Sequence, residues 1–125
     1  MLKTTTIIVA WSGALAASVL AADASGSWAV SSSLVPPDLT CEFALKDSTL
    51  SGSCSAVKVR LPITDGTATD RAVRWTINVP ADTGISTAYI FSGDLNEEGT
   101  AMTGTLILAN GNIGIDKGTF TAKKQ

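Results

Sequence analysis

The stretch CEFALKDSTLSGSC, residues 41–54, carries both cysteines of the chain at its two ends. Apolar and polar residues alternate on each side of a polar break at 47–48, which is the pattern of a β-hairpin with one apolar face. Folding the stretch about that break sets Cys41 directly opposite Cys54. Facing residues in such a pair have Cβ atoms about 4.5–5.5 Å apart, which is close to what a disulfide requires. We therefore predict a disulfide between Cys41 and Cys54.

The residue types in the chain argue against an active site or a metal site. The chain has no histidine, so a Ser-His-Asp or Cys-His catalytic site cannot be built. A zinc site would need about four ligands such as Cys or His, and the chain has two cysteines. No phosphate-binding glycine loop and no convergent pair of carboxylates is evident. We therefore expect that the protein is not an enzyme and has no metal site and no cofactor.

The first residues have the pattern of a secretory signal peptide. Lys3 supplies a positive charge, residues 7–20 are mostly apolar and uncharged, and small residues follow. We predict a signal peptide over residues 1–21 with cleavage after Ala21, and cleavage after Ala24 as the alternative. Cleavage after Ala21 leaves 104 of the 125 residues, which is the length of one domain (22–125).

The predicted export sets the compartment and the partners that we expect. The apolar run is too short to span a bilayer comfortably, so no membrane insertion is expected after its removal. The protein is then secreted or periplasmic, where two cysteines usually form one disulfide. The net charge at pH 7 is −2, and the basic residues are scattered rather than clustered. This distribution argues against nucleic acid as a partner.

Alternation of apolar and polar residues continues through the rest of the chain, without a helical stripe. We expect about eight strands, near 26–34, 38–46, 49–56, 57–62, 71–79, 85–94, 101–109 and 112–123. The predicted fold class is all-β, an antiparallel up-and-down β-barrel, because closure of such a sheet removes its free edges. A two-sheet β-sandwich is the alternative. Residues 62–70 have the composition of an exposed loop.

Two breaks in the alternation predict β-bulges. Val57, Val59 and Leu61 do not continue the face of Cys54, and Gly118 and Phe120 do not continue the face of Ile113 and Ile115.

The second half of the chain predicts three further registers. Setting Leu95 opposite Met102 also sets Tyr89 opposite Leu108. A five-residue loop over 80–84 then sets Trp75 opposite Tyr89.

The third register follows from Asn110-Gly111, a strong signal for a type I′ turn. A turn at these residues pairs Leu108 with Ile113 and Leu106 with Ile115.

These registers give the barrel an apolar inner face. Its predicted members include the aromatic residues that are candidates for a ligand-lined lumen, Phe43, Trp75, Tyr89 and Phe91, together with Leu106 and Ile115. An eight-stranded barrel can be just wide enough for its own side chains to fill it, so we expect a packed core. The alternative is a lumen that carries a small apolar ligand.

The outer face carries a small apolar patch. In the same register Ile90 lies opposite Ile107, and Ala88 lies opposite Ala109, where serine and threonine would be expected. This patch, named the outer patch below, is a candidate interface with a partner or a second copy of the chain. The alternative is that its residues are ordinary apolar residues of the surface. The sequence thus points to an exported binding or structural module.

Two segments resemble the calycin superfamily, which includes lipocalins and avidins. The first strand opens with Gly26-Ser27-Trp28, similar to the Gly-x-Trp that begins calycin barrels, and the last predicted strand includes GTFTAKK (118–124). In lipocalins a basic residue of the last strand covers this Trp, and the resemblance assigns that place to Lys123.

The resemblance to avidins does not extend to their biotin site. Phe91 and Cys54 stand where avidins carry a biotin-stacking Trp and a biotin-contacting Tyr. The resemblance therefore implies a small secreted barrel and no biotin binding.

Overall fold

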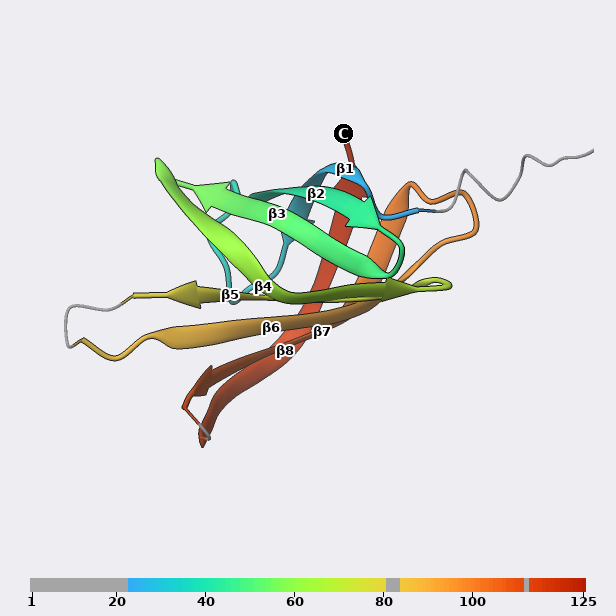
Figure 1. The fold of residues 1–125 in the computed structure, drawn as a ribbon. Helices are drawn as coiled ribbons and strands as arrows, with labels where there is room; N and C mark the ends of the chain where they lie inside the picture. Colours follow the sequence, from blue (N-terminus) through green and yellow to red (C-terminus); the bar gives the residue numbers. More distant parts are fainter. Residues whose placement is uncertain (1–22, 81–83, 112) are drawn as a thin grey trace, which may run out of the picture.

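The chain forms a closed barrel of eight antiparallel strands. The computed structural model describes residues 23–80, 84–111 and 113–125, so the predicted signal peptide lies outside the described residues. The strands are β1 (Gly26–Ser31), β2 (Thr40–Lys46), β3 (Thr49–Ala56), β4 (Val59–Thr69), β5 (Ala72–Val79), β6 (Thr87–Leu95), β7 (Ala101–Asn110) and β8 (Ile113–Lys124). Each strand pairs with the next, and β1 also pairs with β8 (Figure 1). The predicted all-β up-and-down barrel is confirmed.

The β2–β3 hairpin has the predicted register. Cys41 lies opposite Cys54 and the two form a disulfide. Phe43 lies opposite Gly52, whose φ of +136° is rarely adopted by residues with a side chain. A Cβ at Gly52 would also lie 1.9 Å from the carbonyl oxygen of Glu42, so only glycine fits there.

The β6–β7 hairpin also has the predicted register. Leu95 pairs with Met102 and Tyr89 with Leu108. On the other face Ile90 pairs with Ile107. Alternate residues of a strand point to opposite faces, so this register separates an inner set of side chains from an outer set.

The connection between β3 and β4 corrects one prediction. Val57 and Lys58 form a two-residue turn, and both have the positive φ (48° and 66°) that a type I′ turn requires. This turn sets Leu61 opposite Cys54. The break in alternation at these residues is therefore a turn, and the predicted bulge is wrong.

Residues 62–70 are not the exposed loop that we predicted, because β4 continues to Thr69. Its pairing with β5 shifts register between Thr64 and Thr67, and Asp65 within the shift has a φ of 51°. The turn-forming residues of this segment therefore lie in a β-bulge within β4.

The β5–β6 register differs from the prediction by two residues. Trp75 pairs with Phe91, and Ile77 pairs with Tyr89, so the predicted Trp75–Tyr89 pair is wrong. The last pair before the connection is Val79 with Thr87, so the connection is longer than the five residues we expected. A shift of two leaves every side chain on its predicted face, since the side-chain period of a strand is two.

The β7–β8 register also differs from the prediction. Asn110 pairs with Ile113 and Leu108 with Asp116, so the predicted pairs of Leu108 with Ile113 and of Leu106 with Ile115 are wrong. The register shifts between Leu108 and Ala109, which is the bulge expected from the phase break in this strand.

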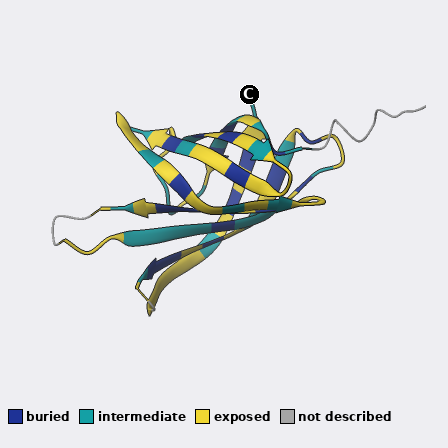
Figure 2. Ribbon diagram, in the orientation of Figure 1, coloured by how far each residue is buried: buried dark blue, intermediate teal, exposed yellow. Residues whose placement is uncertain are grey.

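The first half of β8 is exposed (Figure 2). β1 pairs with β8 only from Thr121 to Lys124, so residues 113–118 are paired on the β7 side alone. Ile113 is 69% exposed and Ile115 is 50% exposed. The placement of Ile115 on the buried inner face is therefore wrong.

Four aromatic rings pack together inside the barrel. Trp75 stacks on Phe91 with 4.7 Å between ring centroids, and Phe43 and Phe120 contact Trp75 edge-on at 4.8 and 5.5 Å. All four side chains are buried. Offset-stacked and edge-to-face pairs are the favoured geometries of aromatic contacts, so this cluster, named the ring cluster below, forms a dense core.

One end of the barrel is closed around Trp28, which is fully buried. Lys124 lies over its ring, with Nζ 5.6 Å from the centroid. The basic residue that covers Trp28 is thus Lys124, and the assignment of this place to Lys123 is wrong. Lys123 pairs with Ala29 and Ala101 and is exposed.

Candidate functional site

The far end of the barrel from Trp28 opens where β4 separates from β5. Pairing between these strands ends at Ile63 with Ile77, whereas residues 59–62 remain paired with β3. Pro62, which has no N–H to donate, lies immediately beyond the last pair. The β3–β4 hairpin and the β5–β6 hairpin therefore diverge, and their inner side chains face a common space.

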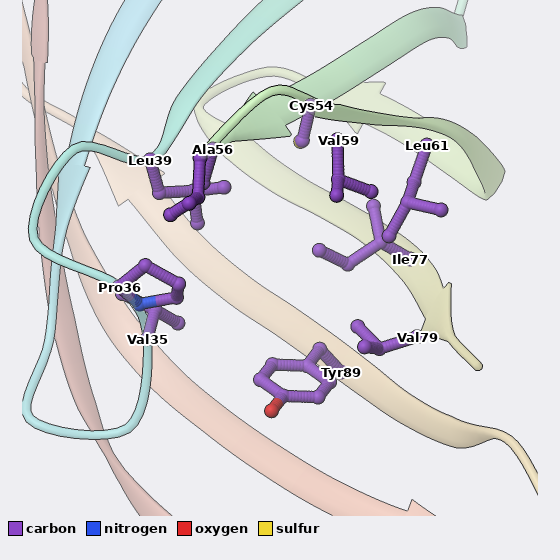
Figure 3. Close-up of a pocket in the computed structure, with 11 residues that line it drawn as sticks. Val35, Pro36, Leu39, Cys54, Ala56, Val59, Leu61, Ile77, Val79 and Tyr89 are labelled. Carbon is purple, nitrogen blue, oxygen red and sulfur yellow. The ribbon is translucent and has the colours of Figure 1, made fainter. Parts of the chain in front are cut away.

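This space is an apolar pocket of about 230 Å³. Its walls come from the diverging hairpins, and the β1–β2 connection contributes the remaining side (Figure 3). The lining residues are Val35, Pro36, Leu39, Cys54, Ala56, Val57, Val59, Leu61, Ile77, Val79 and Tyr89. We name this space the β4–β5 pocket.

The chemistry of the β4–β5 pocket is nearly uniform. No lining residue carries a charge, and the Tyr89 hydroxyl is the one side-chain oxygen among them. Two members on the rim are unusually exposed for valine, Val57 at 68% and Val59 at 53%. Such a surface offers almost no polar groups that could bind an ion. Covering it with an apolar group removes apolar area from water, which is favourable.

The predicted lumen residues divide between the core and the pocket. Phe43, Trp75 and Phe91 belong to the ring cluster and do not line the pocket. Tyr89 lies next to them along β6 and does line it. The inner face therefore holds a packed layer in the barrel, with an apolar pocket on the side away from Trp28.

The predicted outer patch lies on the outer face in the expected pairs, Ala88 with Ala109 and Ile90 with Ile107. Ile107 is 38% exposed, Ala88 and Ile90 are half-buried, and Ala109 is 9% exposed. The exposed apolar surface of the patch is therefore carried mainly by Ile107.

Sequence reasoning missed most of the pocket. The signal was an excess of apolar residues in segments without strand alternation, Val35-Pro36 in a connection and Val57 in a turn. Exposed apolar residues indicate a binding surface when they form one contiguous patch, and the sequence alone does not show that these residues lie together.

In the part of the chain that the structure describes, no three His, Cys, Asp or Glu side chains are grouped so that they could hold a metal ion. Among the same residues no helix is long and apolar enough to cross a membrane. One donor stands out in the core, because Trp75 Nε1 is buried with no acceptor among the described residues.

The comparisons with known proteins identify no relative. No protein-family model, no curated protein and no solved structure matches this chain.

Proposed function

We propose that the protein is an exported, non-enzymatic binding module whose β4–β5 pocket takes a small uncharged apolar ligand. The observation that carries the proposal is the composition of the pocket, whose lining side chains are apolar apart from the hydroxyl group of Tyr89. Burying an unpaired charge among such side chains would be costly, so the ligand is expected to be neutral.

The size of the pocket limits the ligand. A volume of about 230 Å³ corresponds to roughly eight water molecules at liquid density, so a ligand of roughly eight to ten non-hydrogen atoms would fill it. The Tyr89 hydroxyl offers one hydrogen bond to a polar end of that ligand. A medium-length aliphatic alcohol or a small aromatic alcohol has this chemistry.

Export is supported by the disulfide. Both cysteines are buried and bonded, and disulfides persist in oxidising compartments such as the bacterial periplasm or the outside of the cell. A calycin-like assignment is supported by the closed eight-stranded barrel and by the Lys124 contact with Trp28 at its closed end.

The test compares ligands that differ in charge. We expect 1-octanol to bind, measured by calorimetry or by native mass spectrometry, and octanoate at pH 7 to bind at least tenfold more weakly. Native mass spectrometry of protein purified from its own host would show whether a ligand of this class is already present. Equal binding of the two compounds, or binding of neither, contradicts the proposal.

A matched pair of variants locates the site. Val59 is 53% exposed in the pocket and Ile115 is 50% exposed outside it, so a lysine at either position should cost little stability. Val59→Lys should abolish octanol binding, and Ile115→Lys should leave it unchanged. If both variants behave alike, the ligand does not occupy this pocket.

Self-association through the outer patch is a second candidate function, supported by the exposure of Ile107 beside Ile90. Ile107→Lys should then lower the association constant in sedimentation equilibrium while the melting temperature changes little. A monomeric unsubstituted protein at high concentration would exclude this function, and an unfolded variant would show that Ile107 belongs to the core.

A further inference from the structure

Residues 23–25 close the barrel at its Trp28 end. The indole Nε1–H of Trp28 donates a hydrogen bond of 2.9 Å to the carbonyl oxygen of Ala24. Ala24 and Trp28 are both fully buried, and Ala24 belongs to the core cluster. Ala24 therefore supplies both apolar contact and the acceptor that satisfies a buried donor, although it lies before the first strand.

Asp23 ties the same segment to the last strand. Its backbone oxygen accepts a hydrogen bond of 3.2 Å from Lys124 Nζ, the group that lies over the Trp28 ring. Its carboxylate accepts a hydrogen bond of 2.7 Å from the backbone N–H of Ser25 and another from the Ser25 hydroxyl. We name Asp23, Ala24 and Ser25 the N-terminal cap.

The N-terminal cap distinguishes between the two cleavage sites that the sequence allows, after Ala21 and after Ala24. Cleavage after Ala24 would remove Asp23 and Ala24 and leave the buried Trp28 N–H without its acceptor. It would also place the new ammonium group of Ser25 beside Lys124, where the carboxylate of Asp23 now contributes negative charge. Cleavage after Ala21 keeps the whole cap on the processed protein.

We infer that the leader is removed on the N-terminal side of Asp23, as the cleavage expected from the sequence after Ala21 would do, and that the N-terminal cap is a permanent part of the folded protein. The reaction is hydrolysis by a signal peptidase of the exporting cell. Water adds to the Ala21 carbonyl, the Ala21–Ala22 bond breaks, and the two ends become a carboxylate and an amine. The inference rests on the export that forms part of the proposed function.

Signal peptidase acts on a chain that has not yet folded, so the barrel does not protect the bond after Ala24 from cleavage. The constraint comes from the product instead, because a chain that begins at Ser25 lacks two residues that its own core uses.

The first experiment is the intact mass of the exported protein, made from the full chain with its own leader in an exporting host. The expected product begins at Ala22. A product that begins at Ser25 would overturn the role of the cap while leaving export intact. A product that retains the leader would overturn export itself, so the two failures are distinguishable.

The second experiment tests the cap without export. Chains that begin at Ala22, Asp23 or Ser25 are produced directly and oxidised, and their thermal unfolding is compared. The chain that begins at Asp23 keeps the whole cap and should have the same melting temperature as the chain that begins at Ala22. The chain that begins at Ser25 should have a melting temperature about 5–10 °C lower or fail to fold. Equal melting temperatures for all three chains would refute the inference.

Discussion

Trp75 lies at the centre of the ring cluster, and its replacement tests whether this cluster is the core of the barrel. Its side chain is fully buried, stacked on Phe91 and contacted edge-on by Phe43 and Phe120. The Nε1–H of the same ring has no acceptor among the described residues. The residue thus combines a large favourable packing contribution with one unfavourable polar group.

Replacement by alanine removes the packing. Large-to-small changes of buried aromatic residues cost about 3–5 kcal/mol, so we expect Trp75→Ala to lose this much of the free energy of unfolding. That is a large part of the 5–15 kcal/mol that stabilises a typical domain. The variant is expected to be marginally folded.

Replacement by phenylalanine keeps a ring in the stack and removes the unsatisfied donor. Losing roughly three ring atoms should cost about 2 kcal/mol, while an unpaired buried donor costs about 1–3 kcal/mol that the variant no longer bears. The two terms nearly cancel, so the free energy of unfolding of the Trp75→Phe variant should lie within about 1–2 kcal/mol of that of the unsubstituted protein.

The measurement is urea unfolding followed by far-ultraviolet circular dichroism, because both variants lose the fluorescence of Trp75 and keep that of Trp28, so their fluorescence is not comparable with that of the unsubstituted protein. With a slope of about 1.5 kcal/mol/M, the alanine variant should lose roughly 2–3 M of the midpoint, and the phenylalanine variant no more than about 1.3 M. If both variants lose the same amount, the buried Nε1–H of Trp75 does not destabilise the unsubstituted protein. An unchanged alanine variant would show that the ring cluster is not the core.

Two further predictions concern the closed end of the barrel and the disulfide. The hydrogen bond from the Ser25 hydroxyl holds the pKa of Asp23 below its ordinary value of 3.8, outweighing the opposing effect of burial. The stabilisation that the ionised Asp23 carboxylate contributes is therefore present above pH 4 and is lost as the pH falls through the lowered pKa. A profile of the melting temperature between pH 5 and pH 2 should show this loss. The profile of the Asp23→Asn variant should lack it. Thiol titration of the denatured, unreduced protein should find no free thiol, and two free thiols per chain would contradict the Cys41–Cys54 bond.

The sequence was sufficient for those registers that local features determine. The β2–β3 hairpin has a two-residue turn, and a change of one residue in its register would move Cys41 and Cys54 onto opposite faces. Alternation along the two strands therefore selects a single pairing. The same reasoning holds for Leu95 opposite Met102 in the β6–β7 hairpin.

The β5–β6 register could not be predicted in this way. Pairing Trp75 with Tyr89 or with Phe91 differs by two residues, and both choices keep the same side chains inside. What distinguishes them is the stack of Trp75 on Phe91 within a cluster that also includes Phe120 of β8. That contact joins strands distant in sequence, so a local pattern does not reveal it.

The pocket was missed for a related reason. Alternation along one strand indicates which side chains point inwards, but it does not show that β4 leaves β5 beyond Ile63 and Ile77. The residues 62–70 were predicted to be a loop because their composition suits a turn, and the structure uses Asp65 for a bulge instead. A strand that bends at a bulge is well suited to separate from its neighbour.

The disulfide and the pocket are parts of one arrangement. Over residues 59–62, β4 has no partner in β5 among the described pairs, so β3 alone holds this part of the β3–β4 hairpin in the barrel. β3 is in turn fixed to β2 by the Cys41–Cys54 bond, and Cys54 itself lines the pocket. The disulfide therefore stabilises the wall that faces Ile77 and Tyr89. Because this wall has no support from β5, its stability depends more on the disulfide, and disulfides persist in oxidising compartments.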